Sequence, residues 1–238
     1  MKKVVIIGAT SGIGKELALL YIKAGHQVGI TGRRKELLNE FKQLYPSQIF
    51  TLAFDVTGTE NIPHLETLIQ QLGGMDVFVY NSGMGNISKE LNAALEISTT
   101  KTNVNGFLET TVYAFNYFVK QGYGQIAGIS SIASYRGNSW APSYSASKAF
   151  MSNYLEGLRI KAFKMKKKIS VTDIQPGFVK TAMAKGERLF WIQELDKAAK
   201  QIFNAIEKRK GRVQITKRWS LIAVLLKWLP YFLYKKMR

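Results

Sequence analysis

Short apolar runs alternate with stretches of helical periodicity along most of the chain, and this alternation restricts the possible folds more than any other feature. Runs rich in Val, Ile and Phe, bounded by Gly, Pro or Asn, predict strands at 4–7, 26–31, 49–55, 76–80, 125–130, 169–175 and 212–215. Helical spacing lies between them at 14–24, 35–44, 62–72 and 144–163. The alternation predicts an α/β fold with a doubly wound parallel sheet of about seven strands, right-handed crossovers and helices on both faces.

Composition agrees with a folded domain and excludes several kinds of chemistry. Hydrophobic residues make up 46% of the 238 residues, which is enough for a sizeable core. The absence of cysteine excludes disulfides, thiolate nucleophiles and cysteine-bound zinc. The two histidines, His26 and His64, lack ligand spacing, so no metal site is expected. No signal peptide is predicted at the N-terminus, and a cytoplasmic location is expected.

Three glycines stand where the first predicted strand stops and the first helix starts. Gly8 can form the tight turn, Gly12 lets backbone N–H groups approach a pyrophosphate, and Gly14 lets the helix pack closely on the strand. A phosphate would lie at the helix N-terminus, where free N–H groups and the helix dipole favour anions. This strand–turn–helix setting predicts a dinucleotide site of Rossmann type. Its predicted cofactor contacts are the three glycines with Thr10, Ser11 and Ile13 between them.

The tip after the second predicted strand, Gly32-Arg33-Arg34, bears on the choice of nicotinamide cofactor. In dinucleotide-binding folds an acidic residue near this tip binds the ribose of NAD, whereas an arginine accommodates the 2′-phosphate of NADP. Gly32 stands where a carboxylate would lie, and the Arg33 guanidinium could bind phosphate through two charge-assisted hydrogen bonds. An ordinary basic helix start is the alternative, although cations are disfavoured at that end of the helix dipole. These residues favour NADP(H) as the cofactor, with Arg33 as the residue that binds its 2′-phosphate.

One predicted helix carries Tyr144 and Lys148 four residues apart, so both side chains can point to the same side. The ordinary pKa of tyrosine is about 10, too high for ready proton exchange at neutral pH. We expect the ammonium of Lys148, together with an oxidised nicotinamide, to favour the phenolate and lower this pKa. Ser131 follows the apolar run 126–129, so its hydroxyl is expected at the carboxyl end of a strand, where ligands bind in open parallel sheets.

Taken in order, these motifs resemble those of the short-chain dehydrogenase/reductase family over about residues 2–185. Gly8, Gly12 and Gly14 match the family's glycine motif, with Ile7 in place of its usual threonine. The resemblance implies further cofactor contacts: Asp55 and Val56 beside the adenine ring, Asn81 and Gly83 from the family's Asn-Asn-Ala-Gly element, and Pro176, Gly177, Val179 and Thr181 around the nicotinamide amide.

The resemblance also implies the catalytic residues and the reaction. Asn103 matches the family's catalytic asparagine, Ser131 its serine, and Tyr144 and Lys148 its Tyr-x-x-x-Lys. The implied reaction interconverts a carbonyl and a hydroxyl: NADPH delivers hydride to carbon, Ser131 polarises the carbonyl, and Tyr144 gives a proton to oxygen. Lys148 would also hold the nicotinamide ribose, and Asn103 would position a water for proton relay.

Substrate contacts are expected mainly after Pro176. The candidates to cover an apolar, lipid-like or steroid-like substrate are Phe178, Met183, Leu189, Phe190 and Trp191, with Trp140 and Met84; core packing is the alternative for each. The resemblance implies a homodimer or homotetramer through helices near 103–121 and 144–165. Two alternative functions are a soluble carbonyl reductase whose tail joins subunits and a non-catalytic NADPH-binding regulator at a membrane. No nucleic-acid partner is expected, because the sequence holds no binding motif for one.

The C-terminal segment departs in composition from the rest of the chain. Residues 219–234 are apolar except for Ser220 and Lys227, and residues 156–238 hold 21 basic and 6 acidic residues, a net charge of +15. As one helix, 219–234 would span roughly 24 Å, short of the ~30 Å hydrocarbon core of a bilayer. We therefore divide the chain into a dinucleotide-binding catalytic domain, 1–216, and a tail, 217–238.

This tail is predicted to lie as a helix in an anionic membrane surface, with Trp and Tyr at the level of the headgroups and lysines on the lipid phosphates. Such binding would place the enzyme on the cytoplasmic face of the membrane. A subunit interface and a lid over the substrate are the alternatives for the same apolar surface.

Overall fold

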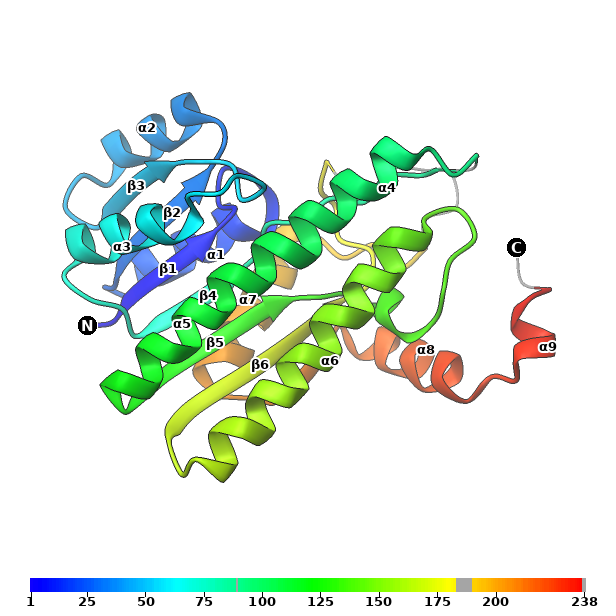
Figure 1. Cartoon of the computed structure of the whole chain (residues 1–238). Helices are drawn as coiled ribbons and strands as arrows, with labels where there is room; N and C mark the ends of the chain where they lie inside the picture. Colours follow the sequence, from blue (N-terminus) through cyan, green and yellow to red (C-terminus); the bar gives the residue numbers. More distant parts are fainter. Residues whose placement is uncertain (89, 183–189, 237–238) are drawn as a thin grey trace.

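One parallel sheet forms the centre of the computed structural model, which describes residues 1–88, 90–182 and 190–236 (Figure 1). Within these residues the strand order is β3-β2-β1-β4-β5-β6-β7, and every neighbouring pair is parallel. The strands are β1 Lys3–Ile7, β2 Gln27–Gly32, β3 Ile49–Ala53, β4 Val77–Tyr80, β5 Tyr123–Ile129, β6 Lys168–Pro176 and β7 Arg212–Ile215. The order reverses between β1 and β4, the place where such sheets bind ligands outside the carboxyl ends of the strands. The predicted doubly wound, Rossmann-type sheet is confirmed.

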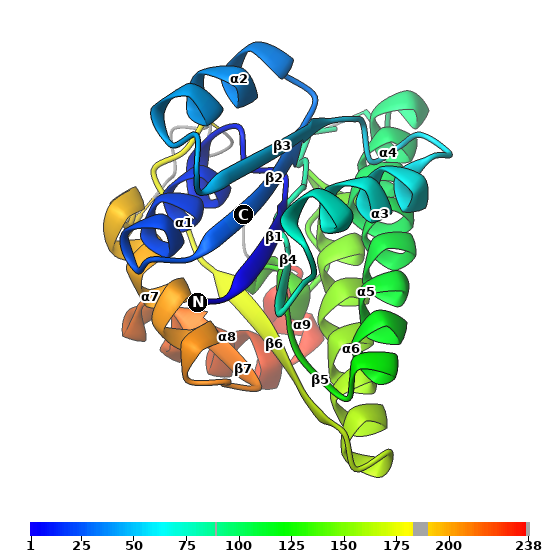
Figure 2. The ribbon, with the colours of Figure 1, turned by 90° about the vertical axis from the view of Figure 1, so that its left-hand side faces the viewer.

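Helices cover both faces of the sheet, because successive side chains of a strand point to opposite faces. Val4 and Ile6 of β1 pack in one core, and Val5 and Ile7 pack in the other. Figure 2 shows the two helical layers on either side of the strands. The first layer is formed by α1 Gly12–Lys23, α2 Lys35–Leu44 and α7 Leu195–Glu207, and the second by α3 Asn61–Leu72, α5 Phe107–Gln121 and α6 Pro142–Lys164.

Of the boundaries that differ from the sequence prediction, two have clear local reasons. Strand β3 ends before Asp55, because the Asp55 carboxylate accepts hydrogen bonds from the backbone N–H and the hydroxyl of Thr57, both at 2.9 Å, and so closes a turn. Helix α1 begins at Gly12, two residues before the predicted start, since Ser11 is extended (φ −163°) at the position directly before the helix. Both turns lie at the carboxyl edge of the sheet.

The C-terminal segment forms two helices, α8 Lys217–Trp228 and α9 Tyr231–Tyr234. The prediction of a single helix over 219–234 is wrong. Leu229 is extended (ψ 122°), because the ring of Pro230 disfavours a helical conformation in the residue before it and Pro230 itself has no N–H to donate. Among the described residues, no helix has the length and hydropathy needed to cross a bilayer.

Helix α8 packs on the domain through one face. Trp219 and Ala223 are buried with Ile132 in a small third core cluster. Arg136 donates through Nε to the carbonyl of Leu226 at 2.7 Å, and its Nη2 donates to the carbonyl of Leu229. Leu226 lies in the last turn of α8 and Leu229 directly follows the helix, where intrahelical donors run out. The division of the chain into a catalytic domain and a tail stays a prediction, although the two parts share this contact.

The outer side of α5 and α6 carries a shallow groove. Its lining residues are Val112, Phe115, Asn116, Asn153, Tyr154, Gly157, Leu158 and Lys161. The homodimer or homotetramer expected through these two helices stays a prediction.

The burial of Trp219 generates a stability prediction. Trp219→Ala should lower the free energy of unfolding by about 3–5 kcal/mol, because it removes a ring that is only 4% exposed and leaves a cavity. The matched control is Trp228→Ala in the same helix, whose side chain is 75% exposed and should matter little. Urea unfolding of the two variants measures the difference; equal destabilisation would contradict the packing of α8 described above.

Candidate active site

The turn between β1 and α1 leaves no room for side chains at two of its glycines. A Cβ at Gly8, which has φ +84°, would lie 2.5 Å from the hydroxyl oxygen of Ser82. A Cβ at Gly14 would overlap the carbonyl oxygen of Gly8. Asn81 closes this junction, because its Nδ2 donates to the Gly8 carbonyl at 2.5 Å and its backbone N–H donates to Ile7 at 3.0 Å. The turn therefore lies directly against the end of β4, with the N-terminus of α1 open toward the carboxyl edge.

The two arginines of the β2 tip point to different partners. Arg33 lies 3.6 Å from the Asp55 carboxylate, and both side chains are largely exposed. Arg34 instead reaches the glycine-rich turn, where its Nη2 donates to the hydroxyls of Thr10 at 2.6 Å and Ser11 at 2.8 Å. Arg33 was the predicted phosphate ligand, whereas Arg34 was not predicted to contact the turn. The role of Arg33 as a phosphate ligand stays a prediction, and the doubled arginine was the signal that a second candidate existed.

Asp55 and Val56, expected beside the adenine ring, follow β3 at the same edge. The Asp55 carboxylate is occupied by the turn at Thr57 and by Arg33. Val56 is buried, and a Cβ at Gly106 would lie 2.6 Å from its carbonyl oxygen. The adenine contact of these two residues stays a prediction.

Asn103 lies in a π-helical turn, Lys101–Gly106, that joins α4 (Ala93–Thr100) to α5. Such turns occur often at functional sites, because they rotate side chains out of the α-helical register. The buried Asn103 amide accepts from the backbone N–H of Met84 at 2.9 Å, and it donates to the Met84 carbonyl at 2.8 Å and the Ser147 hydroxyl at 2.9 Å. Asn103 thus connects the loop after β4 to α6 through hydrogen bonds.

The three side chains expected to carry proton transfer lie together. Lys148 Nζ is 5.8 Å from the centroid of the Tyr144 ring, and it donates to the carbonyl of Ile129 at the end of β5. Ser131 hydrogen-bonds to Tyr144, and its hydroxyl also accepts from the N–H of Ala133 at 3.1 Å. Loop glycines pack directly over the pair: a Cβ at Gly83 would lie 3.3 Å from Lys148 Nζ, and one at Gly85 would lie 2.9 Å from the Tyr144 ring.

The pKa of Tyr144 differs in direction from the sequence expectation. Burial of the phenol raises its pKa, and the hydrogen bond with Ser131 only opposes this effect. Burial also lowers the pKa of Lys148 to about 8, although the negative charge of Asp173 acts to raise it. The expected lowering of the tyrosine pKa rested on Lys148 and an oxidised nicotinamide acting together. With the protein groups alone, desolvation of the phenolate has the larger effect.

Asp173 is a buried carboxylate that was not predicted from the sequence. It lies inside β6, where it accepts hydrogen bonds from Ser130 at 2.5 Å, Ser152 at 2.6 Å, Gln175 at 2.9 Å and Arg212 at 3.1 Å. An acidic residue within the apolar run 169–175 was the available signal, since a charge is rarely buried without partners. The carboxylate connects β5, β6, β7 and α6.

The segment after β6 lies between the glycine-rich turn and α8. Thr181 is beside the turn, since a Cβ at Gly12 would lie 3.6 Å from its methyl carbon. Val179 is buried, and Pro176 accepts a hydrogen bond from Ser131 at 3.4 Å. A Cβ at Gly177 would fall within the ring of Trp219. The nicotinamide contacts implied for this segment stay predictions, but the segment does lie next to the dinucleotide turn and Ser131.

The predicted substrate residues separate into groups. Phe178, Phe190 and Trp191 surround Trp219, with ring centroids 5.3, 5.2 and 6.3 Å away from it. Met84 is held by Asn103, and Trp140 lies in the loop before α6, where its carbonyl accepts from Ser88 at 2.7 Å. The remaining candidates, Met183 and Leu189, lie outside the described residues.

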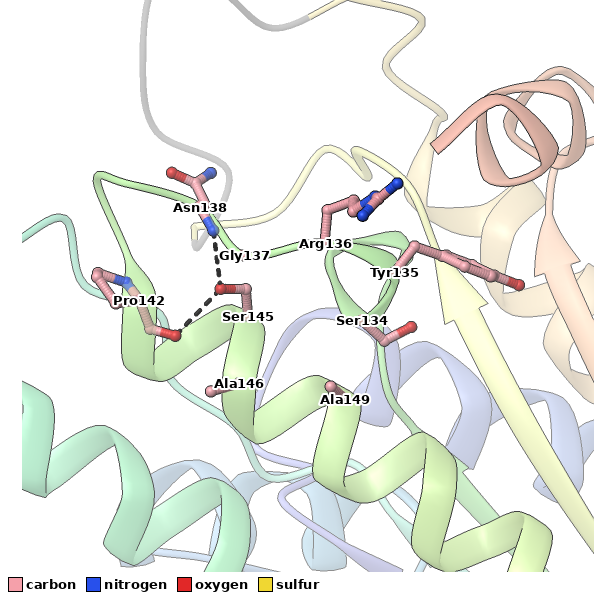
Figure 3. Close-up of a pocket in the computed structure, with 9 residues that line it drawn as sticks. All are labelled: Ser134, Tyr135, Arg136, Gly137, Asn138, Pro142, Ser145, Ala146 and Ala149. Atoms are coloured by element: carbon pink, nitrogen blue, oxygen red, sulfur yellow. Dashed lines mark hydrogen bonds between the residues drawn. The ribbon is translucent and has the colours of Figure 1, made fainter. Parts of the chain in front are cut away.

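A pocket of about 470 Å³ opens on the other side of α6 (Figure 3). Its lining residues are Ser134, Tyr135, Arg136, Gly137, Asn138, Pro142, Ser145, Ala146 and Ala149. Ser145 closes its rim, where its hydroxyl accepts from the N–H of Asn138 at 3.1 Å and donates to the carbonyl of Pro142 at 3.0 Å. Pro142, Ser145, Ala146 and Ala149 line the pocket from one face of α6, and Tyr144 and Lys148 are not among its lining residues.

The lowered pKa of Lys148 generates a stability prediction with a definite sign. Between pH 8 and pH 10.5, the unfolded chain keeps a proton on Lys148 that the folded protein has lost. The free energy of unfolding should therefore rise with pH across this window, by about 3 kcal/mol in total, relative to a Lys148→Met variant. Urea unfolding of both proteins, without cofactor, measures this change. Parallel pH dependences in the two proteins would contradict the assignment.

Comparison with known proteins agrees with this geometry. The sequence model of the short chain dehydrogenase family matches residues 2–190. An uncharacterized oxidoreductase of Myxococcus xanthus is 33% identical over 184 residues, which cover 75% of this chain and 72% of that protein.

Two solved structures share the fold. A closed serine dehydrogenase complexed with NADP+ has a TM-score of 0.79 and 22% identity, over 89% of this chain and 93% of that one. A 3-ketoacyl-(acyl-carrier-protein) reductase from Brucella melitensis, complexed with NADH, has a TM-score of 0.81 and 19% identity, over 90% of this chain and 96% of that one. From the family match and the arrangement of Ser131, Tyr144 and Lys148, we conclude that this chain belongs to the short-chain dehydrogenase family of oxidoreductases.

Proposed function

We propose that this oxidoreductase uses NADP(H) to interconvert a carbonyl and a hydroxyl group on an apolar, lipid-like or steroid-like substrate. The observation that carries the proposal is the grouping of Ser131, Tyr144 and Lys148 at the carboxyl edge of the sheet, beside the glycine-rich turn. Such a grouping supplies a hydrogen-bond donor, a proton donor and a cation within reach of one ligand.

The residues at the carboxyl edge of the sheet could accommodate a dinucleotide. The β1–α1 turn has no space for a Cβ at Gly8 or Gly14, so its backbone stays accessible at the N-terminus of α1. Thr181 lies across the turn from the same helix end. When bound, the nicotinamide supplies or accepts the hydride.

Two features of the β2 tip support NADP(H) over NAD(H). A side chain at Gly32 would collide with the Thr10 methyl group, since its Cβ would lie 2.5 Å from that carbon, so the tip disfavours a ribose-binding carboxylate there. Arg34 places one guanidinium on the glycine-rich turn and Arg33 places a second beside Asp55, and both groups are suited to a 2′-phosphate. One structural neighbour is complexed with NADP+ and another with NADH, so the fold itself leaves both cofactors open.

The protein side of the mechanism follows from the positions of the groups. Tyr144 donates its phenolic proton to the carbonyl oxygen, and the raised pKa keeps that proton in place until charge develops on the substrate. The Ser131 hydroxyl donates a hydrogen bond to the same oxygen and stabilises the developing negative charge. Lys148, largely cationic below its pKa of about 8, favours the phenolate that remains after transfer. Asn103 keeps the loop after β4 packed over this pair.

The apolar character of the substrate is inferred from the segment that follows β6. Phe190, Trp191 and Ile192 are all substantially exposed next to the segment that flanks Ser131. Exposed aromatic and aliphatic side chains beside a polar reaction centre suit a ligand with a large apolar body and one polar group.

Substitution of the proton donor tests the mechanism. Tyr144→Phe should lower turnover on the order of 10²-fold or more while leaving NADPH affinity nearly unchanged, because only the phenolic proton is removed. NADPH consumption over a panel of apolar ketones, aldehydes and keto-lipids measures the loss. Tyr154→Phe, on the same helix but packed against Phe107 and Phe150, is the matched control and should keep full activity. Near-normal turnover of Tyr144→Phe would refute the mechanism.

The cofactor assignment is tested by thermal unfolding. NADPH should raise the melting temperature more than an equal concentration of NADH, because the ligand that binds the folded state more tightly stabilises it more. Arg33→Ala and Arg34→Ala should each weaken NADPH binding by about tenfold or more, as expected for a lost charge-assisted hydrogen bond, and leave NADH unchanged. Lys35→Ala is the control in the same tip. Equal shifts from the two cofactors in the unmutated protein would exclude the preference for NADP(H).

A further inference from the structure

Helices α8 and α9 expose an extensive apolar surface. Its members, which we call the C-terminal apolar face, are 44–75% exposed: Leu221, Val224, Leu225, Trp228, Tyr231, Phe232 and Leu233. Contiguous apolar surface of this kind is rare on a protein that has no partner for it. Figure 1 shows α9 at the outer edge of the molecule, beyond α8. The face therefore calls for a specific occupant.

The face is held in place by contacts on the opposite side of the same helices. Trp219 and Ala223 turn inward from α8, and Arg136 binds the carbonyls at its end. The Tyr234 hydroxyl of α9 donates to the carbonyl of Gly137 at 2.6 Å, and the Arg136 guanidinium lies 5.5 Å from the centroid of the Tyr234 ring. These contacts orient the outward side chains as one surface.

The charges around the face are of a single sign. Residues 208–238 contain ten Lys and Arg residues and no Asp or Glu. Of these cations, Arg218, Lys227, Lys235 and Lys236 are exposed on or beside the two helices. A second copy of the chain, paired symmetrically through this face, would bring these like charges together. An anionic surface would instead neutralise them while it buries the apolar side chains.

The length of the helices fixes the mode of binding. Helix α8 has 12 residues, or about 18 Å, and α9 has 4 residues, so neither could cross a hydrocarbon core of ~30 Å. An apolar face flanked by lysine and arginine, with Trp228 and Tyr231 among its members, suits a helix lying in the plane of the interface.

The face also adjoins the proposed substrate side of the enzyme. Arg218, at the start of α8, lies 6.0 Å from the ring of Trp191, and Trp219 packs on Phe190 and Gly177. We infer that α8 and α9 dock the enzyme on an anionic lipid bilayer, with the exposed segment 190–192 beside the lipid. An apolar substrate then reaches the catalytic residues from the bilayer; this last step rests on the proposed function, whereas the docking does not.

The test uses the full chain and point substitutions, because deletion of the helices would also remove the buried Trp219. Co-sedimentation is measured with vesicles of phosphatidylcholine alone and with equal parts of phosphatidylcholine and phosphatidylglycerol. The unmutated protein should bind the anionic vesicles at low salt, bind the neutral ones weakly, and lose part of its binding in high salt. The double variant Trp228→Glu/Phe232→Glu should bind anionic vesicles at least about tenfold more weakly, because it places two carboxylates in the apolar face.

The matched control is Phe163→Glu, at the far end of α6, where the side chain is 84% exposed and the same change should leave vesicle binding intact. Circular dichroism and the melting-temperature shift with NADPH confirm that each variant is folded. Because no substrate is present, a failure of the proposed catalysis would not affect this readout.

Several outcomes would overturn the proposal. One is a full-length protein that stays in the supernatant with anionic vesicles at low salt. Another is a double variant that binds these vesicles as well as the unmutated chain does. Light scattering without lipid provides a third: a larger assembly that the double variant dissociates would assign the face to a second copy of the chain. A rise in KM of the double variant without lipid would assign it to a lid over the substrate.

Discussion

The buried carboxylate of Asp173 is the constraint on which the arrangement of the catalytic elements depends. Four donors converge on it: Ser130 directly after β5, Ser152 in α6, Arg212 in β7, and Gln175 two residues further along β6 itself. Removing a charge from water is unfavourable unless it is paired and fully hydrogen-bonded, so the carboxylate holds these elements in one geometry. Ser130 precedes Ser131, and Ser152 lies one turn beyond Lys148. The network therefore fixes both ends of the candidate proton-transfer site.

A second connection joins the candidate active site to the C-terminal helices. Gly177 gives Trp219 the space to pack on the segment that follows β6, and Phe178 and Phe190 complete the aromatic cluster. Because α8 starts directly after β7, the strand that carries Arg212, the Asp173 network and the aromatic cluster support neighbouring parts of the same edge. The helices that carry the exposed apolar face are thus part of the packing around the site.

The sequence predicted the parts of the site that depend on local spacing. Tyr144 and Lys148 lie on one side of α6 because they are four residues apart, and Ser131 lies at the end of β5 because the apolar run before it stops there. Arg34 was missed because Arg33 and Arg34 lie in the bend between β2 and α2, and only the fold shows which of the two faces the glycine-rich turn. Asp173 was missed because its four partners come together only in the folded chain.

The sequence by itself determined the parallel sheet, its two helical layers and the place of the dinucleotide turn. Hydrophobic periodicity and the positions of glycines reflect local conformation over a few residues. They therefore predict helices, strands and turns without knowledge of the tertiary contacts. Tertiary structure decided the direction of the Tyr144 pKa, the arginine that reaches Thr10 and Ser11, and the burial of Trp219 beside the exposure of Trp228. Each of these depends on desolvation or on contacts between residues far apart in the chain, and neither property exists until the chain has folded.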